Sequence, residues 1–198
     1  MAKCKFHTIR GLGLLAALAG SLTFQPVFAG QISTLAGQVE TQIAAGDGAA
    51  AVAGARQILD EVWTQLPLGF STVALADGDP SGFGVFNERD SDTYKPGEPI
   101  VIYAEPYGFG YGKVAEGVWR IAFDVDLVVK SADGAMLANM PNIMKLALNT
   151  RRRNKEFHAN LTYNLTGAGP GSYVLVTTFR DQNSDKSASF EMPIGIAE

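Results

Sequence analysis

The chain has 198 residues, with 16 basic and 20 acidic side chains, a formal net charge of −4 and a hydrophobic content of 46%. A net negative surface disfavours nucleic acid and other polyanions as general partners. A single cysteine, Cys4, excludes an intramolecular disulfide and a cysteine-rich zinc site. We therefore expect no nucleic-acid partner and a fold stabilised by its hydrophobic core.

Residues 1–29 have the pattern of an export signal peptide. Three basic residues and no acid precede an apolar run at 11–22, which is too short for a mature membrane span. The small residues of VFAG predict cleavage after Ala29. Cleavage after Ala19 and an uncleaved N-terminal anchor are the alternatives. Processing would leave 13 basic against 20 acidic residues, a net charge of −7, in a periplasmic or secreted protein with no later transmembrane segment.

Residues 30–67 predict an α-helical hairpin. Apolar residues recur at steps of three and four over 32–43 and again over 52–66. A glycine-rich AGDG break separates the two runs, where Asp47 can cap the second helix, and Pro67 ends it. The stripe of the second helix consists of Val52, Ala55, Leu59, Val62 and Leu66. A hairpin cannot bury both stripes alone, so it packs on the rest of the chain or forms a homodimer with a second copy.

Residues 68–198 predict a mainly β domain. Short runs rich in valine, isoleucine and aromatic residues alternate with glycine and proline turns, and apolar side chains occupy every second position at 119–127 and 157–165. The expected strands are 70–76, 83–87, 99–105, 118–130, 143–149, 156–165, 172–180 and 187–196. Seven or eight such strands without intervening helices predict an antiparallel sandwich of two sheets.

The last hairpin, GPGSYVLVTTFRDQNSDKSASFEMPIGI, resembles that of immunoglobulin-like and fibronectin-like sandwiches. A proline-glycine turn precedes Tyr173, and in such domains a tyrosine bonds through its hydroxyl to the corner before it. The resemblance implies this role for Tyr173 and a core position for Trp119. More broadly, the stretch from GFGVFNERD at residue 82 to the C-terminus is similar to an uncharacterised family of exported bacterial proteins. This similarity implies an immunoglobulin-like sandwich in the cell envelope and supplies no catalytic residue.

Groups suited to catalysis or metal binding are sparse after the predicted signal. His158 is the one histidine there, on the polar face of its strand, and no G-x-S-x-G motif frames a serine. The stretch from Asp181 begins like a calcium loop, but Lys186 and Met192 stand where glycine and glutamate are needed. We therefore expect no metal or cofactor and favour a non-enzymatic protein.

A pair of carboxylates provides the enzymatic alternative. Asp124 and Asp126 share one face of the strand expected at 118–130. Paired carboxylates hydrolyse glycosides when they line a cleft and one of them has a raised pKa. A carboxylate-dependent hydrolase of envelope polysaccharide is thus the rival function. Solvated side chains on an open sheet, beside Arg120, would instead be structural.

An aromatic, glycine-rich loop is one candidate ligand site. Tyr107, Phe109 and Tyr111 alternate with glycines between two expected strands. Aromatic rings on a loop suit stacking on sugars or peptides. Alternatively, the rings cover the open end of the sandwich and complete its core.

A basic run is the second candidate site. TRRRNKEF places Arg151, Arg152, Arg153 and Lys155 before an expected strand, where Arg151 and Arg153 would share a face and Arg152 would lie opposite. Such charges either prevent unwanted pairing at a sheet edge or bind an anionic glycan or headgroup. Together the two sites favour an exported binding module for an envelope protein or glycan. A purely structural spacer, dimerised by its hairpin, stays open.

Overall fold

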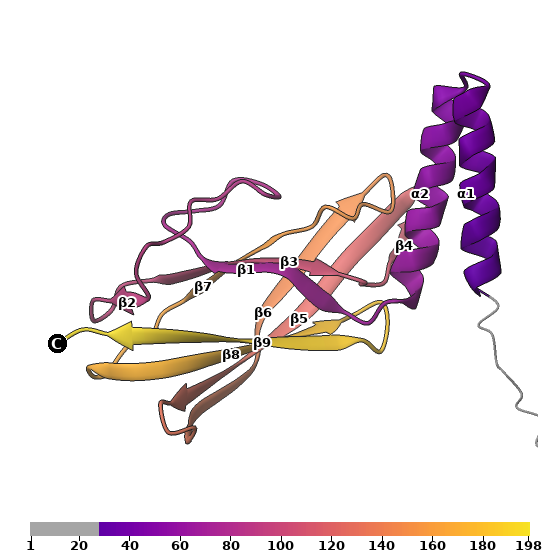
Figure 1. Cartoon of the computed structure of the whole chain (residues 1–198). Coiled ribbons are helices and arrows are strands. Elements are labelled where there is room, and N and C mark those ends of the chain that lie inside the picture. The colour runs from indigo at the N-terminus through magenta and orange to yellow at the C-terminus, as the bar shows by residue number, and fades with distance from the viewer. Residues whose placement is uncertain (1–27) are drawn as a thin grey trace, which may run out of the picture.

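The computed structural model describes residues 28–198, so the predicted export signal lies outside the described residues except for its last two positions. Within this range two helices precede nine strands, and the helical pair projects from one end of a β-sandwich (Figure 1). None of the helices in residues 28–198 has the length and hydrophobicity that a membrane span requires.

The two helices form the predicted hairpin. They are α1 (Phe28–Ala44) and α2 (Gly48–Gln65). The Asp47 side chain accepts the Ala50 N–H at 3.0 Å and so caps the N-terminus of α2. The backbone becomes extended at Leu66, directly before the proline. The prediction for this hairpin and its cap is confirmed.

The apolar stripe predicted on α2 is exposed in the single chain. Val52 and Leu59 are 52% and 44% exposed. Instead, α2 turns its small residues toward α1: Ala51 is buried, and a Cβ on Gly54 would lie 2.7 Å from the Val39 side chain. Small side chains allow the two helix backbones to approach closely. The stripe next to them therefore has no cover within residues 28–198, and dimerisation through it stays a prediction.

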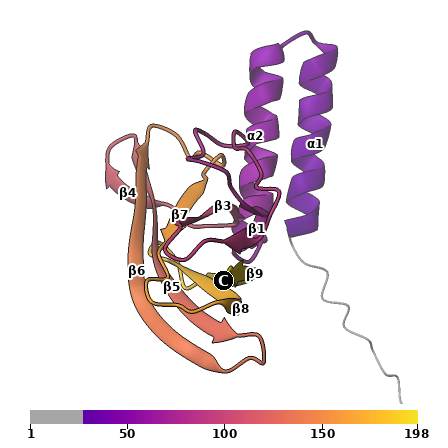
Figure 2. The same cartoon turned by 90° about the vertical axis from the view of Figure 1, so that its left-hand side faces the viewer.

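Nine strands make two sheets of unequal size. The strands are β1 (Gly69–Leu75), β2 (Thr93–Tyr94), β3 (Ile100–Tyr107), β4 (Gly112–Ala115), β5 (Val118–Ser131), β6 (Met136–Thr150), β7 (Ala159–Tyr163), β8 (Gly171–Asp181) and β9 (Ser187–Ile196). The small sheet has the order β1-β3-β7. The large sheet has the order β2-β9-β8-β5-β4, with β6 also paired to β5. All pairs are antiparallel except β2 with β9, and the sheets face each other (Figures 1 and 2).

Several predicted strand limits are wrong. Residues 83–87 form no strand but a loop with isolated bridges, because Gly84 adopts a φ of +70° and reverses the chain. Strand β6 begins seven residues before the predicted residue 143. The earlier start was not predicted because Pro141 and Asn142 interrupt the strand pattern of the sequence. Strands β2 and β4 were missed because they have only two and four residues.

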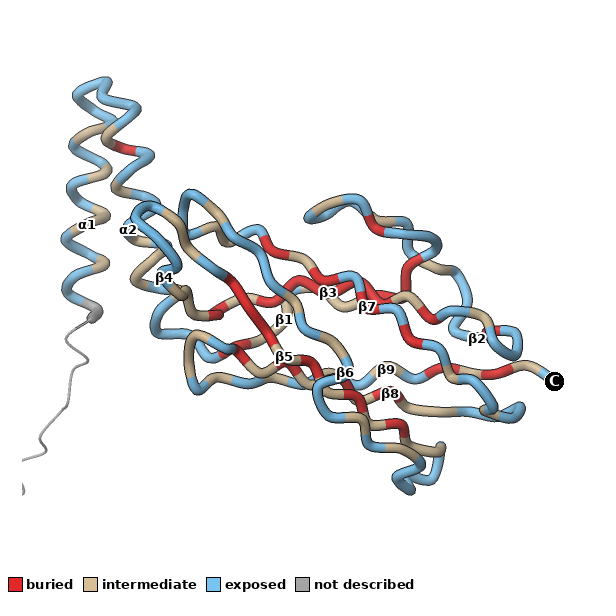
Figure 3. Tube along the Cα trace, turned by 180° about the vertical axis from the view of Figure 1, so that it is seen from behind, coloured by how far each residue is buried: buried red, intermediate tan, exposed pale blue. Residues whose placement is uncertain are grey.

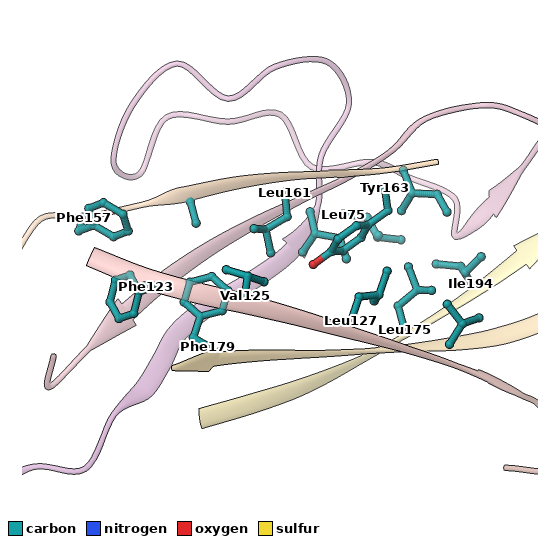
Figure 4. Packing of buried hydrophobic residues seen from close by; sticks show 14 of the residues in the cluster. Leu75, Phe123, Val125, Leu127, Phe157, Leu161, Tyr163, Leu175, Phe179 and Ile194 are labelled. Carbon is teal, nitrogen blue, oxygen red and sulfur yellow. The ribbon is translucent and has the colours of Figure 1, made fainter. Parts of the chain in front are cut away.

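The core lies between the two sheets (Figures 3 and 4). The alternation predicted on β5 is confirmed, since Ile121, Phe123 and Val125 are all 0% exposed. The Tyr173 hydroxyl donates to the Gly169 carbonyl at 2.8 Å, as the resemblance implied. Trp119, in contrast, is only half-buried, because β5 extends past the end of the core at its N-terminus.

Candidate functional site

A hollow of about 610 Å³ lies between α2 and the loop that joins β6 to β7. Its walls are Arg56, Leu59 and Asp60 of α2, Trp119 of β5, and residues 152–156 of the loop. We call this hollow the cationic cleft and residues 151–158 the arginine loop. Its lining residues thus come from both the helical hairpin and the sandwich.

Local hydrogen bonds turn the arginine loop away from strand geometry. The Thr150 hydroxyl donates to the Arg152 carbonyl at 2.5 Å, and the Asn154 N–H donates to the same carbonyl at 2.8 Å. Bonds of this kind between a side chain and nearby backbone compete with a strand ladder. The alternation expected for the arginines is therefore wrong. Arg152 and Arg153 both line the cleft, whereas Arg151 does not.

The guanidinium of Arg153 lies over two aromatic rings. Its guanidinium carbon lies 4.5 Å from the centre of the Trp119 ring and 5.8 Å from that of Tyr111. Stacking engages the flat face of a guanidinium and leaves its N–H groups at the edge free to donate. Sequence reasoning missed Trp119 as a site residue. Its position at the start of the expected strand, directly before Arg120, was the signal available in the sequence.

Positive charge dominates the cleft. Arg56, Arg152 and Arg153 are exposed and form no ion pair within residues 28–198. Lys155, in contrast, is paired with Asp60 at 2.5 Å, so these two charges offset each other. Three unpaired guanidiniums, one from α2 and two from the arginine loop, therefore line the cleft together with the unpaired carboxylate of Glu156, in a chain whose net charge is −4.

Phe109 fills the core rather than a ligand site. It is 1% exposed, and its ring packs edge-on against Trp63 and Phe123. The Trp63 indole N–H donates to the Phe109 carbonyl at 2.9 Å. A ligand cannot reach this ring in the folded chain. For Phe109 the structure shows the alternative reading, in which the aromatic loop closes the end of the core.

The other two aromatic residues of that loop have different surroundings. The Tyr111 hydroxyl donates to the Asn154 carbonyl at 2.8 Å and accepts from the Lys155 ammonium at 3.1 Å, so it positions the arginine loop. Burial, with a smaller contribution from the Asp60 charge, raises the pKa of Tyr111. Tyr107 is half-buried, with its hydroxyl beside Gly69, and does not line the cleft.

A lysine from the β8–β9 turn fixes the end of α2. The Lys186 ammonium donates to the carbonyls of Leu66 and Gly108, both at 2.7 Å. A cation at a helix C-terminus satisfies carbonyls that have no partner in the helix and offsets its dipole. In the same turn the buried Asp181 carboxylate accepts the Gly110 N–H at 2.6 Å. The stretch from Asp181 to Lys186, which resembles the start of a calcium loop in sequence, thus connects α2, the aromatic loop and the sandwich.

The structure also shows the surroundings of the residues considered for metal binding and hydrolysis. Residues 28–198 contain no cluster of three or more histidine, cysteine or acidic side chains that could hold a metal. Asp124 and Asp126 lie on the outer face of β5, where Arg180 donates to Asp126 at 2.9 and 3.0 Å. This hydrogen bond lowers the pKa of Asp126. His158 stacks on the Tyr103 ring with a centroid distance of 5.7 Å.

Comparison with protein-family models finds no match, and comparison with curated proteins finds none either. Among solved structures, the chain is similar to the sporulation control protein Spo0M from Bacillus subtilis, with 14% identity and a TM-score of 0.35. That match covers 67% of this chain and 50% of Spo0M, so the chain spans half the length of that protein. A CARDB domain from Pyrococcus furiosus, in complex with di-metal ions, matches at 14% identity and a TM-score of 0.30, covering 68% of this chain and 96% of the domain. Likenesses this distant carry no argument about function.

Proposed function

We propose that this protein is an exported, non-enzymatic module of the bacterial cell envelope, periplasmic or secreted, that binds an anionic glycan in the cationic cleft. One observation carries the proposal: Arg56, Arg152 and Arg153 line the cleft together with Trp119, the Arg153 guanidinium lies over the Trp119 ring, and none of the three arginines has an ion pair among the described residues. The export pattern of residues 1–29 supports the compartment.

The chemistry of the cleft suits a carboxylated sugar. Guanidinium groups bind carboxylates through two parallel charge-assisted hydrogen bonds. The indole of Trp119 offers an apolar surface to the C–H groups of a sugar ring. A volume of about 610 Å³ lies within the range of about 300–1,000 Å³ that is usual for small-ligand sites.

We infer further that the sandwich over residues 68–198 is immunoglobulin-like and that the hairpin over residues 30–67 is an appended element. Two facing, mainly antiparallel sheets and the hydrogen bond from Tyr173 to Gly169 support this assignment. The hairpin contributes Arg56 to the cleft, which explains why a binding module would keep it attached to the sandwich.

The rival hydrolase has weaker support. A glycosidase needs one carboxylic acid with a raised pKa to protonate the leaving group. The Arg180 hydrogen bond shifts the pKa of Asp126 in the opposite direction, and the Gln182 amide donates to Asp124 at 2.9 Å. Both carboxylates lie on the outer face of the sheet, away from the cleft.

Tryptophan fluorescence of the purified protein tests the proposal. The probe is a short oligogalacturonate, a carboxylated sugar chain, with a neutral malto-oligosaccharide of the same length as its control. We expect only the oligogalacturonate to change the emission, because Trp119 lies in the cleft. Arg153→Ala should weaken binding at least about tenfold, since a charge-assisted hydrogen bond contributes about 1.5–3 kcal/mol. Arg120→Ala, on the opposite face of the same strand, should leave it unchanged.

Two outcomes would count against an anionic-glycan site. Equal responses to the charged and neutral sugars would show that the arginines do not select the ligand. A response to poly-glutamate but not to oligogalacturonate would assign the cleft to an acidic protein segment instead.

A further inference from the structure

The small sheet ends at β7, whereas the large sheet continues to β6. Strand β7 pairs only with β3, and β6 pairs only with β5, among the strands that the structure describes. In Figure 2, β6 lies beyond β7 at the margin of the molecule. The small sheet is therefore one strand too narrow to cover the large sheet on this side.

Burial confirms that the inner face of β6 lacks cover. Leu148 of β6 lies opposite Ile121 of β5 in the register, yet Leu148 is 39% exposed and Ile121 is 0% exposed. Leu146 lies opposite Phe123 and is likewise only half-buried. The inward-facing side chains are thus buried on β5, whereas their partners on β6 are partly exposed.

An apolar groove of about 400 Å³ occupies the uncovered place between β6 and β7. Leu146 and Leu148 come from β6, Phe157 and Ala159 from the other side, and Phe83 from the loop above. Glu156 also lines the groove, and its carboxylate has no ion pair within residues 28–198. The groove thus presents apolar side chains, one negative charge and the unpaired backbone edge of β7.

The edge of β7 lacks the features that protect other edges. Natural edge strands carry charges, prolines or bulges that prevent pairing with another chain. Strand β6 has such features in Pro141, Lys145 and a bulge at Asn142, which has a φ of 54°. From Phe157 to Phe179 there is neither a charged residue nor a proline within a strand. A free edge of this kind is open to strand addition.

We propose that β7 binds an extended peptide segment of another envelope protein, which becomes the fourth strand of the small sheet. Main-chain hydrogen bonds to Ala159–Tyr163 hold the segment, and its alternate apolar side chains cover the inner face of β6. A basic residue at one end of the segment pairs with Glu156. This site shares only Glu156 with the lining of the cationic cleft, and it does not depend on the function proposed for the cleft.

The geometry favours a lone segment over a second copy of this chain. A two-fold axis that paired β7 with the same strand of a second copy would bring that copy's β6 into the space of this chain's β5. The clash arises because β6 lies beyond β7 in the adjacent layer (Figure 2). An extended segment that is not part of a wider sandwich brings no such strand with it.

Amide hydrogen exchange of the purified protein tests this site with a synthetic seven-residue peptide. The peptide has valine at alternate positions, threonine between them, and lysine at its first or its last position in two versions. At saturation, one version should slow the exchange of the β7 amides at least tenfold and leave those of β4 unchanged. The same peptide with an N-methyl group on every residue lacks the donors for a ladder, so it should bind at least tenfold more weakly.

A matched pair of variants locates the binding in the groove. Leu148→Lys places a charge on the groove floor and should weaken peptide binding at least tenfold. Ile143→Lys, at a site of the same strand with nearly equal exposure, 38% against 39%, lies outside the groove and should not. The proposal would be overturned if neither peptide slowed the exchange of the β7 amides, or if the N-methylated peptide bound as tightly as the parent peptide. It would also be overturned if both variants bound the peptide as tightly as the wild type. Equal loss in both variants with unchanged thermal unfolding would do the same.

Discussion

Gly108 and Lys186 lie outside the cationic cleft, yet they position one of its walls. Both contact the end of α2, the helix that brings Arg56 to the cleft. Neither role could be predicted from the sequence, because Lys186 and Leu66 are 120 residues apart and no local pattern joins them. Asp47 and Tyr173 were predictable because their hydrogen-bond partners are only three and four residues away.

Replacing Gly108 by alanine should destabilise the protein by more than about 2 kcal/mol. Gly108 has a φ of +75°, and a Cβ there would lie 2.2 Å from the Pro67 carbonyl oxygen, which is backbone and cannot move aside cheaply. Gly117 is a matched control, since it has a φ of +64° and open space around its Cβ position. Gly117→Ala should cost only about 1–2 kcal/mol, from backbone strain alone. Urea unfolding measures both, and equal costs would contradict the close contact.

Replacing Lys186 by methionine should destabilise the protein by about 1.5–3 kcal/mol, the usual contribution of hydrogen bonds to a charged donor. The carbonyls of Leu66 and Gly108 would lose their partner while the apolar stem is kept. Lys113→Met, on the exposed strand β4, is the control and should change the free energy of unfolding by less than about 0.5 kcal/mol. If chemical unfolding gives the same value for both variants, Lys186 does not cap α2.

Among the secondary-structure elements, strands with one clean apolar face were the most predictable. Strands β5 and β8 alternate without interruption, and their predicted limits agree with the structure within a residue. Strand β6 was found only in part because its bulge at Asn142 breaks the period of two. That bulge depends on a neighbouring strand: Asp126 accepts the Asn142 N–H at 2.7 Å, and Arg180 donates to the Asn142 side chain at 2.6 Å. Only the folded sheet brings these groups together.

The stability of this sheet should fall in acid through Asp126. The Arg180 hydrogen bond lowers the pKa of Asp126 in the folded state, so the unfolded chain takes up the proton first. The stabilisation is complete above the unfolded value of about 4 and is lost as the pH falls through the folded-state pKa. Asp126→Asn should therefore lower the free energy of unfolding at pH 7 and flatten its decline below about pH 4. Asp185→Asn, at an exposed position, should reproduce the wild-type decline. An unchanged acid slope in Asp126→Asn would contradict the pairing.

At the scale of the whole molecule, the cleft exists because a helical hairpin is attached to a sandwich. Sequence reasoning predicted both parts and proposed Arg153 as a ligand-binding residue. It could not place Arg56 beside Arg153, since they come from different parts of the fold. It assigned Arg151 instead of Arg152 because it extended strand geometry into a loop. Phe109 was the central residue of the predicted aromatic site, but it is buried in the core. Its contacts with Trp63 could not be predicted from any local sequence pattern.

The hairpin should open more readily than the sandwich. Ala51 is the one buried residue of α2, whereas β5 contributes six to the core. Segments with few buried contacts exchange their amide hydrogens through local opening. We expect the amides of α1 to exchange at least about a hundredfold faster than those of β5, as measured by mass spectrometry on the purified protein. Equal protection would mean that something covers the exposed stripe of α2, and sedimentation would then show whether it is a second copy.

The most direct test of the proposed function is a map of amide chemical shifts during titration of the purified protein with oligogalacturonate. A carboxylated sugar in the cationic cleft should shift the amides around Arg56, Trp119 and residues 152–156, with the outer face of β5 near Asp126 unaffected. Shifts that cluster around Asp124 and Asp126, or no shifts in the arginine loop at saturation, would contradict a glycan site in this cleft.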